Sequence, residues 1–204
     1  MKIIILRHAK RHGSPLFETE LTEYGKEQSN KLVLELEKHK IDEIYSSPFL
    51  RVIQTIYPFC KKHGYKINVE NAFYEALKSE EFTYFNCHHK VDEIYQKYPK
   101  FNDIVSQYKS FTNVANISHV ESDIDINNRV HPFIWKLIKK YKDTDKCILI
   151  ATHQTICNVI KKYFDINVNY RDEFSQGTFE IIDVPNDTTG PASIVYKQPE
   201  YSHN

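Results

Sequence analysis

Hydrophobic runs of two kinds alternate along the chain. Short continuous runs of apolar residues, often β-branched, are too short for helices and predict buried strands. Longer stretches in which apolar residues recur every three or four positions predict amphipathic helices. The predicted strands cover residues 2–6, 41–45, 147–151, 178–184 and 193–196. The predicted helices cover residues 22–38, 49–62, 127–141 and 156–164.

The alternation of strands with helices predicts an α/β fold in three layers, with a mostly parallel central sheet and helices on both faces. A chain of 204 residues suffices for one such domain, and we assign residues 1–204 to it. Residues 82–119 break the alternation and are rich in Tyr, Phe and His. We interpret this stretch as a helical insertion, spanning about residues 78–120, that contributes two helices over the carboxyl ends of the strands.

Charge and the N-terminal sequence exclude several classes of partner. The chain has 27 basic and 27 acidic residues, so no net field favours nucleic acid or an anionic membrane. The first apolar run, Ile3 to Leu6, is far shorter than the apolar region of a signal peptide or a membrane span. We therefore expect a cytoplasmic protein without a nucleic-acid or membrane partner.

The four cysteines form no C-x-x-C pair, which predicts reduced and mostly buried thiols. They are Cys60, Cys87, Cys147 and Cys157. The sequence Cys87-His88-His89 lacks the spaced second cluster that a closed metal site needs, and it is interpreted as a surface histidine pair.

Arginine is rare, which draws attention to each occurrence. Only five of the 27 basic residues are arginine: Arg7, Arg11, Arg51, Arg129 and Arg171. Since lysine supplies the ordinary surface charge, arginine is expected where a planar fork must bind phosphate or carboxylate.

Chemically versatile residues follow the predicted strands directly. Arg7 and His8 come after strand 2–6, and His153 follows strand 147–151. Ligands of such folds bind beyond the carboxyl ends of the strands, where these side chains would meet. Ser46-Ser47-Pro48 is a turn that can cap the next helix, with Pro48 in its first turn and Arg51 projecting beside it.

Several motifs, in this order, resemble the signature of one enzyme family. They are Arg7-His8, the string S-S-P-x-x-R-x-x-Q-T from Ser46 to Thr55, and Thr152-His153. Further matches are L-T-x-x-G-x-x-Q from Leu21 to Gln28 and E-S with a later Arg from Glu121 to Arg129. An Arg-His pair arises often by chance, whereas the S-S-P string is specific. The chain thus resembles branch 1 of the histidine phosphatase superfamily, whose fold is that of phosphoglycerate mutase.

The resemblance implies a histidine acid phosphatase-like phosphomonoesterase that needs no metal or cofactor. His8 would attack the phosphoryl group and form a phosphohistidine that water hydrolyses. Arg7, Arg51 and His153 would bind the phosphoryl oxygens, and their charge would keep the His8 imidazole neutral. The substrate would be a phosphorylated small molecule or a phosphoprotein.

The same resemblance implies that Glu75 donates the proton to the leaving oxygen. Its aromatic neighbours, Phe73 and Tyr74, are expected to raise the pKa of its carboxyl group. Glu80 and Glu81 are weaker alternatives for the same role.

The residues after the nucleophile depart from the family pattern. Ala9, Lys10 and Arg11 stand where the family usually has Gly, an acidic residue and Ser or Thr, and Ser14 replaces a common Asn. Arg11 and Ser14 either line the phosphate pocket or lie in an exposed loop. Ala9 resembles small phosphohistidine phosphatases, whereas Arg11 resembles a branch with protein-tyrosine phosphatase members. Two alternative functions stay open: a phosphoglycerate mutase-type phosphotransferase and a catalytically inert phospho-ligand binding module.

Overall fold

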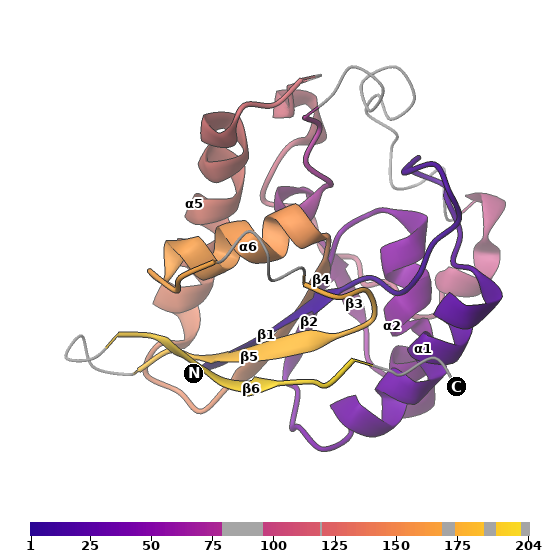
Figure 1. The fold of residues 1–204 in the computed structure, drawn as a ribbon, viewed down its shortest axis with the longest axis horizontal. Helices are drawn as coiled ribbons and strands as arrows, with labels where there is room; N and C mark the ends of the chain where they lie inside the picture. Colours follow the sequence, from indigo (N-terminus) through magenta and orange to yellow (C-terminus); the bar gives the residue numbers. More distant parts are fainter. Residues whose placement is uncertain (79–95, 119, 169–173, 186–190, 201–204) are drawn as a thin grey trace.

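The computed structural model describes residues 1–78, 96–118, 120–168, 174–185 and 191–200. Six strands form one sheet in the order β3-β2-β4-β1-β5-β6 (Figure 1). β3, β2, β4 and β1 run parallel. β5 pairs antiparallel with β1, and β6 pairs antiparallel with β5. The strands are β1 (Lys2–Arg7), β2 (Glu43–Ser46), β3 (Ile67–Val69), β4 (Cys147–Thr152), β5 (Phe179–Asp183) and β6 (Ser193–Lys197).

Helices cover both faces of this sheet, which confirms the three-layer α/β fold. The helices are α1 (Glu23–Leu36), α2 (Leu50–His63), α5 (Asp123–Tyr141) and α6 (Gln154–Tyr163). α1 and α2 lie on one face and α5 and α6 on the other (Figure 1). The central strand β1 is buried on both sides: Ile4 and Leu6 pack into the core under α1 and α2, and Ile3 and Ile5 into the core under α5 and α6.

The structure differs from the prediction at β3, a strand that the sequence pattern did not predict. The strand β3 has three residues, too few to show a pattern, yet it pairs in parallel with β2. The described part of the insertion, residues 96–118, contains two short 3₁₀ helices, Pro99–Phe101 and Val114–Asn116. Part of this segment lies beside β3, where Val105 pairs with Ile67. Residues 79–95, including Cys87-His88-His89, lie outside the described residues.

The thiols agree with the sequence as far as they are described. Cys60, Cys147 and Cys157 are free and buried. Burial raises the pKa of each of these thiols, so they stay protonated at neutral pH. Among the described helices, none is long and apolar enough to cross a membrane.

The register of the sheet sets where the polar residues meet. In the pairing of β1 with β4, Arg7 lies opposite Thr152, so His8 and His153 follow at adjacent strand ends. Ser46 in β2 pairs with Ala151 of β4, which brings Ser47 to the same edge. The carboxyl ends of the parallel strands therefore converge on one place, as the rule for such folds predicts.

Candidate active site

His8 is a buried histidine whose tautomer is fixed by the main chain. Its Nδ1 lies 2.8 Å from the carbonyl oxygen of Ala9. A carbonyl only accepts, so Nδ1 carries the proton and Nε2 carries the lone pair. Burial holds the pKa of His8 well below its ordinary value, and the charge of Arg51 and the interaction with His153 lower it further. His8 is therefore a neutral imidazole at neutral pH, with Nε2 as its basic atom.

The loop after His8 is held by groups from α1 and α2. The amide of Ala9 donates to Thr55 Oγ1 at 2.9 Å, and the amide of Lys10 donates to Gln28 Oε1 at 2.9 Å. The carbonyl of Lys10 accepts from the amide of Thr22 at 2.9 Å. A Cβ on Gly25 would lie 2.0 Å from that same carbonyl oxygen, so this position requires glycine.

The motif alone indicates no role for these residues, and the structure supplies one. Thr22, Gly25 and Gln28 recur every three residues at the start of α1, so they share one face of the helix. That face contacts the main chain just after His8. The spacing was the available signal, but it did not say what the face would touch.

Arg51, Glu75 and His153 meet next to His8. Arg51 Nη2 lies 3.2 Å from Glu75 Oε2, and His153 Nδ1 lies 3.0 Å from the same oxygen. The Arg51 side chain is fully buried and also donates to the carbonyl of Leu16 at 2.8 Å. The rings of His8 and His153 meet edge to face with centroids 5.3 Å apart. The structure thus brings together four of the five residues named as catalytic.

Ser47 is part of this cluster, and the sequence analysis missed it. Its Oγ lies 2.8 Å from Nε2 of His153. Since the carboxylate of Glu75 only accepts, the proton of His153 is on Nδ1, and Nε2 accepts from the Ser47 hydroxyl. The predicted capping by this turn is wrong: α2 has Phe49 as N-cap, makes no side-chain cap, and begins after Pro48. The hydroxyl serves His153, 106 residues away, which no local pattern could show.

The charge state of Glu75 is opposite to the expectation from its neighbours. Burial alone would raise the pKa of the carboxyl group, as predicted. The electrostatic interaction and hydrogen bond with His153 and the charge of Arg51 outweigh burial and hold the pKa of Glu75 below its ordinary value. Burial lowers the pKa of His153 to about 4 and that of Arg51 to about 10. At neutral pH the cluster therefore holds a carboxylate, a guanidinium cation and two neutral imidazoles.

The remaining candidates lie around this centre. Arg7 is partly buried, and its Nη1 donates to the carbonyl of Phe174 at 2.5 Å. Arg11 donates to the carbonyls of His12 and Gly13, and its charge bears on the pKa of Arg51. Ser14 is exposed and its carbonyl accepts from Thr19, so the hydrogen-bond network around His8 does not include it.

His8, Glu75 and His153 also offer three atoms that a metal ion could use. These atoms lie within 4.8 Å of one another. The guanidinium of Arg51, in contact with two of the three residues, places a positive charge where the ion would sit. An anion suits this combination better than a cation does.

Comparison with known proteins agrees with the geometry. The model of the histidine phosphatase superfamily (branch 1) matches residues 3–192. The chain belongs to this superfamily. It is 25% identical over 160 residues to phosphoserine phosphatase 1 of Hydrogenobacter thermophilus, covering 75% of this chain and 71% of that protein.

Solved structures of the superfamily share the fold. The ecdysone phosphate phosphatase of Bombix mori, solved with tungstate, superimposes with a TM-score of 0.74 at 13% identity, covering 100% of this chain and 95% of its own. A putative alpha-ribazole-5'-P phosphatase of Escherichia coli gives a TM-score of 0.68 at 17% identity, covering 98% and 96%. At these identities the likeness concerns the fold of this superfamily member and not its substrate.

Proposed function

We propose that this superfamily member is a metal-independent phosphomonoesterase that forms a phosphohistidine on Nε2 of His8. The observation that carries the proposal is the fixed tautomer of His8, whose unprotonated Nε2 lies in a buried cluster with Arg51. In the first step the Nε2 lone pair forms a bond to phosphorus while the bond to the ester oxygen breaks. Water then attacks phosphorus, releases inorganic phosphate and restores His8.

Arg51, His153 and Arg7 are the proposed ligands of the phosphoryl oxygens. The planar guanidinium of Arg51 would bind two oxygens. The Nδ1–H of His153, which donates to Glu75, would donate to a third when substrate binds. Arg7 adds positive charge at the end of β1. These donors favour the transition state because negative charge spreads over the equatorial oxygens during transfer.

Glu75 is the proposed acid, although its lowered pKa makes it a carboxylate at neutral pH before substrate binds. A phosphate ester that takes Arg51 and His153 removes the two partners that lower the pKa of Glu75 and adds negative charge beside it. Both effects raise the pKa, so Glu75 takes up a proton as the substrate binds. Glu75 then gives this proton to the leaving oxygen and accepts one from the attacking water.

The named relatives support a phosphorylated small molecule as substrate. Their names specify phosphoserine, ecdysone phosphate and alpha-ribazole-5'-P as the molecules they act on. These alcohols differ widely, whereas each presents a phosphate monoester. The His8 cluster would bind the phosphate group that these substrates share, and residues outside the cluster would select the alcohol.

The test measures phosphate release from p-nitrophenyl phosphate in metal-chelating buffer, together with trapping of an acid-labile phosphoenzyme. Wild type and His8→Ala are compared, with His12→Ala as the matched control because His12 is an exposed histidine of the same loop. We expect turnover and phosphoenzyme in wild type and His12→Ala but not in His8→Ala. Equal activity in His8→Ala, or activity that needs metal, contradicts the mechanism. A folded wild type that binds phosphate without turnover supports the inert binding module, and interconversion of phosphoglycerates supports the mutase.

A further inference from the structure

The main chain of the segment that carries Glu75 is hydrogen-bonded to a side chain of α5. This segment runs from a short 3₁₀ helix, Asn71–Phe73, to Leu77. Arg129 of α5 donates from Nη1 to the carbonyl of Ala72 at 2.7 Å and from Nη2 to the carbonyl of Glu75 at 3.2 Å. The guanidinium thus binds main-chain oxygens before and at the residue proposed as the acid.

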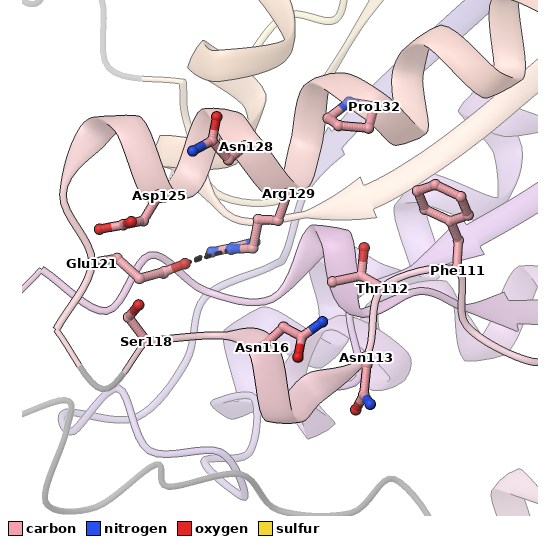
Figure 2. A pocket seen from close by; sticks show the side chains of 10 residues that line it. All are labelled: Phe111, Thr112, Asn113, Asn116, Ser118, Glu121, Asp125, Asn128, Arg129 and Pro132. Carbon is pink, nitrogen blue, oxygen red and sulfur yellow. Dashed lines mark hydrogen bonds and ion pairs between the residues drawn. The ribbon is translucent and has the colours of Figure 1, made fainter.

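Glu121 forms hydrogen bonds with the other end of the segment. Its Oε2 accepts from the amide of Leu77 at 3.0 Å, and its own amide donates to the carbonyl of Leu77 at 2.8 Å. The two side chains also bind each other: Arg129 Nε donates to Glu121 Oε1 at 2.6 Å and Nη2 to Oε2 at 2.9 Å (Figure 2). Arg129 and Glu121 are 8% and 4% exposed, so each charge depends on the other.

We propose that Glu121 and Arg129 are positioning residues that hold the Glu75 carboxylate against Arg51 and His153. The inference rests on the proposed function, because it concerns the acid of that reaction. The hydrogen bonds of the pair to Ala72, Glu75 and Leu77 go to main-chain atoms. The pair therefore sets where the carboxylate stands without hydrogen bonding to it. Proton transfer to the leaving oxygen is sensitive to such placement, since a displacement of about 1 Å costs up to about 10²-fold in rate.

A cavity gives access to the pair from outside. It has a volume of about 420 Å³, and Glu121 and Arg129 line it together with the polar side chains of Asn113, Asn116 and Asn128 (Figure 2). In Figure 2 the labelled side chains come from α5 and from the segment that precedes it. A small cation such as guanidinium can therefore reach the place that the Arg129 side chain occupies.

The first experiment uses the basicity of the leaving group as its readout. Phenol, with a pKa of about 10, needs a proton to leave, whereas the more acidic p-nitrophenol does not. The rate of phosphoenzyme formation is measured by rapid quench with phenyl phosphate and with p-nitrophenyl phosphate. Glu121→Gln leaves one acceptor oxygen for the three donors that Glu121 now binds. The control is Glu35→Gln, which removes the ion pair between Glu35 of α1 and Lys38, a residue just beyond the end of that helix.

The expected result is selective and depends on Glu75. Glu121→Gln slows phenyl phosphate about tenfold while p-nitrophenyl phosphate changes by less than about threefold. In a Glu75→Gln background, adding Glu121→Gln causes no further selective loss. Equal slowing of both substrates, or a loss that persists without Glu75, overturns the inference. These outcomes all require phosphoenzyme, so they differ from failure of the proposed function, in which wild type forms none.

A second variant keeps the test decisive if Glu121→Gln does not fold. Arg129→Lys keeps the positive charge but loses the fork that spans Ala72, Glu75 and Glu121. It is expected to show the same selective loss. Arg129→Ala is expected to regain the rate with phenyl phosphate when guanidinium chloride is added at millimolar concentration. A fold-stable Arg129→Lys with both rates at the wild-type level overturns the inference.

Discussion

The guanidinium of Arg51 and the carboxylate of Glu75 meet inside the protein, with Nη2 3.2 Å from Oε2. The Arg51 side chain has no exposure and that of Glu75 is 14% exposed. If Arg51 binds the phosphoryl group, the carboxylate and the substrate compete for one cation. Glu75 then neutralises the charge of Arg51 before an anion binds. Glu75 gains its proton only after the anion has replaced it as the partner of Arg51.

This competition predicts tighter anion binding when the carboxylate is removed. Glu75→Gln leaves Arg51 and His153 without a negative partner, so inorganic phosphate should bind about tenfold more tightly, equivalent to about 1.4 kcal/mol. Isothermal titration calorimetry of wild type, Glu75→Gln and the control Glu35→Gln measures the change. Unchanged or weaker binding in Glu75→Gln would show that the carboxylate does not compete with phosphate.

The buried fork of Arg51 predicts that lysine is a poor substitute. Arg51→Lys keeps the charge but cannot bind two phosphoryl oxygens while donating to the carbonyl of Leu16. We expect kcat/KM for p-nitrophenyl phosphate to fall by about 10²–10³-fold. Circular dichroism checks that the variant is folded. A loss of only a few-fold would mean that charge alone, and not the fork, matters here.

The contact between Gly25 and the nucleophile loop predicts a steric penalty for any side chain there. In Gly25→Ala the new Cβ would lie 2.0 Å from the carbonyl oxygen of Lys10, so the loop after His8 must shift. We expect a loss of about 1–3 kcal/mol in the free energy of unfolding and slower phosphoenzyme formation. Gly13→Ala is the matched control, because nothing lies within 4 Å of a Cβ at Gly13. Urea denaturation that gives the same stability for both variants would refute the role assigned to Gly25.

The two buried imidazoles predict loss of stability in mild acid. The pKa of His8 is held well below 6.5, and that of His153 is lowered to about 4. Well above the ordinary histidine pKa of about 6.5, neither the folded nor the unfolded chain protonates them, so they add no pH dependence there. As pH falls from about 6.5 towards 4, these two imidazoles bind protons in the unfolded chain but not in the folded chain. The free energy of unfolding then drops by up to about 1.4 kcal/mol per pH unit for each histidine.

Urea denaturation between about pH 7 and pH 5 measures this slope. His8→Gln removes one of the two groups, so its stability should fall less steeply than that of wild type. His12→Gln, which replaces an exposed histidine of the same loop, is the matched control. A slope for His8→Gln as steep as that of wild type would show that His8 is protonated in the folded protein.

Local sequence patterns predicted the strands of the sheet other than β3, the helices α1, α2, α5 and α6, and the edge at which the candidate site residues meet. The continuous apolar runs at β1 and β4 are visible because strands buried on both faces need apolar residues at every position. Arg7-His8 and His153 follow those strands directly. Their meeting could therefore be inferred from the rule that ligands bind beyond the carboxyl ends of the strands. The three-residue β3 left no pattern, and only its pairing with β2 reveals it.

The tertiary structure alone decided the charges and the supports of the site. Aromatic neighbours in the sequence suggested a raised pKa for Glu75, but Arg51 and His153, 24 and 78 positions away in the chain, reverse the direction. Ser47 became a partner of His153 instead of a helix cap for the same reason. Periodicity reports which face of an element is buried. The charge of a buried group depends on distances of a few ångströms to residues remote in the chain, and those distances exist only once the chain has folded.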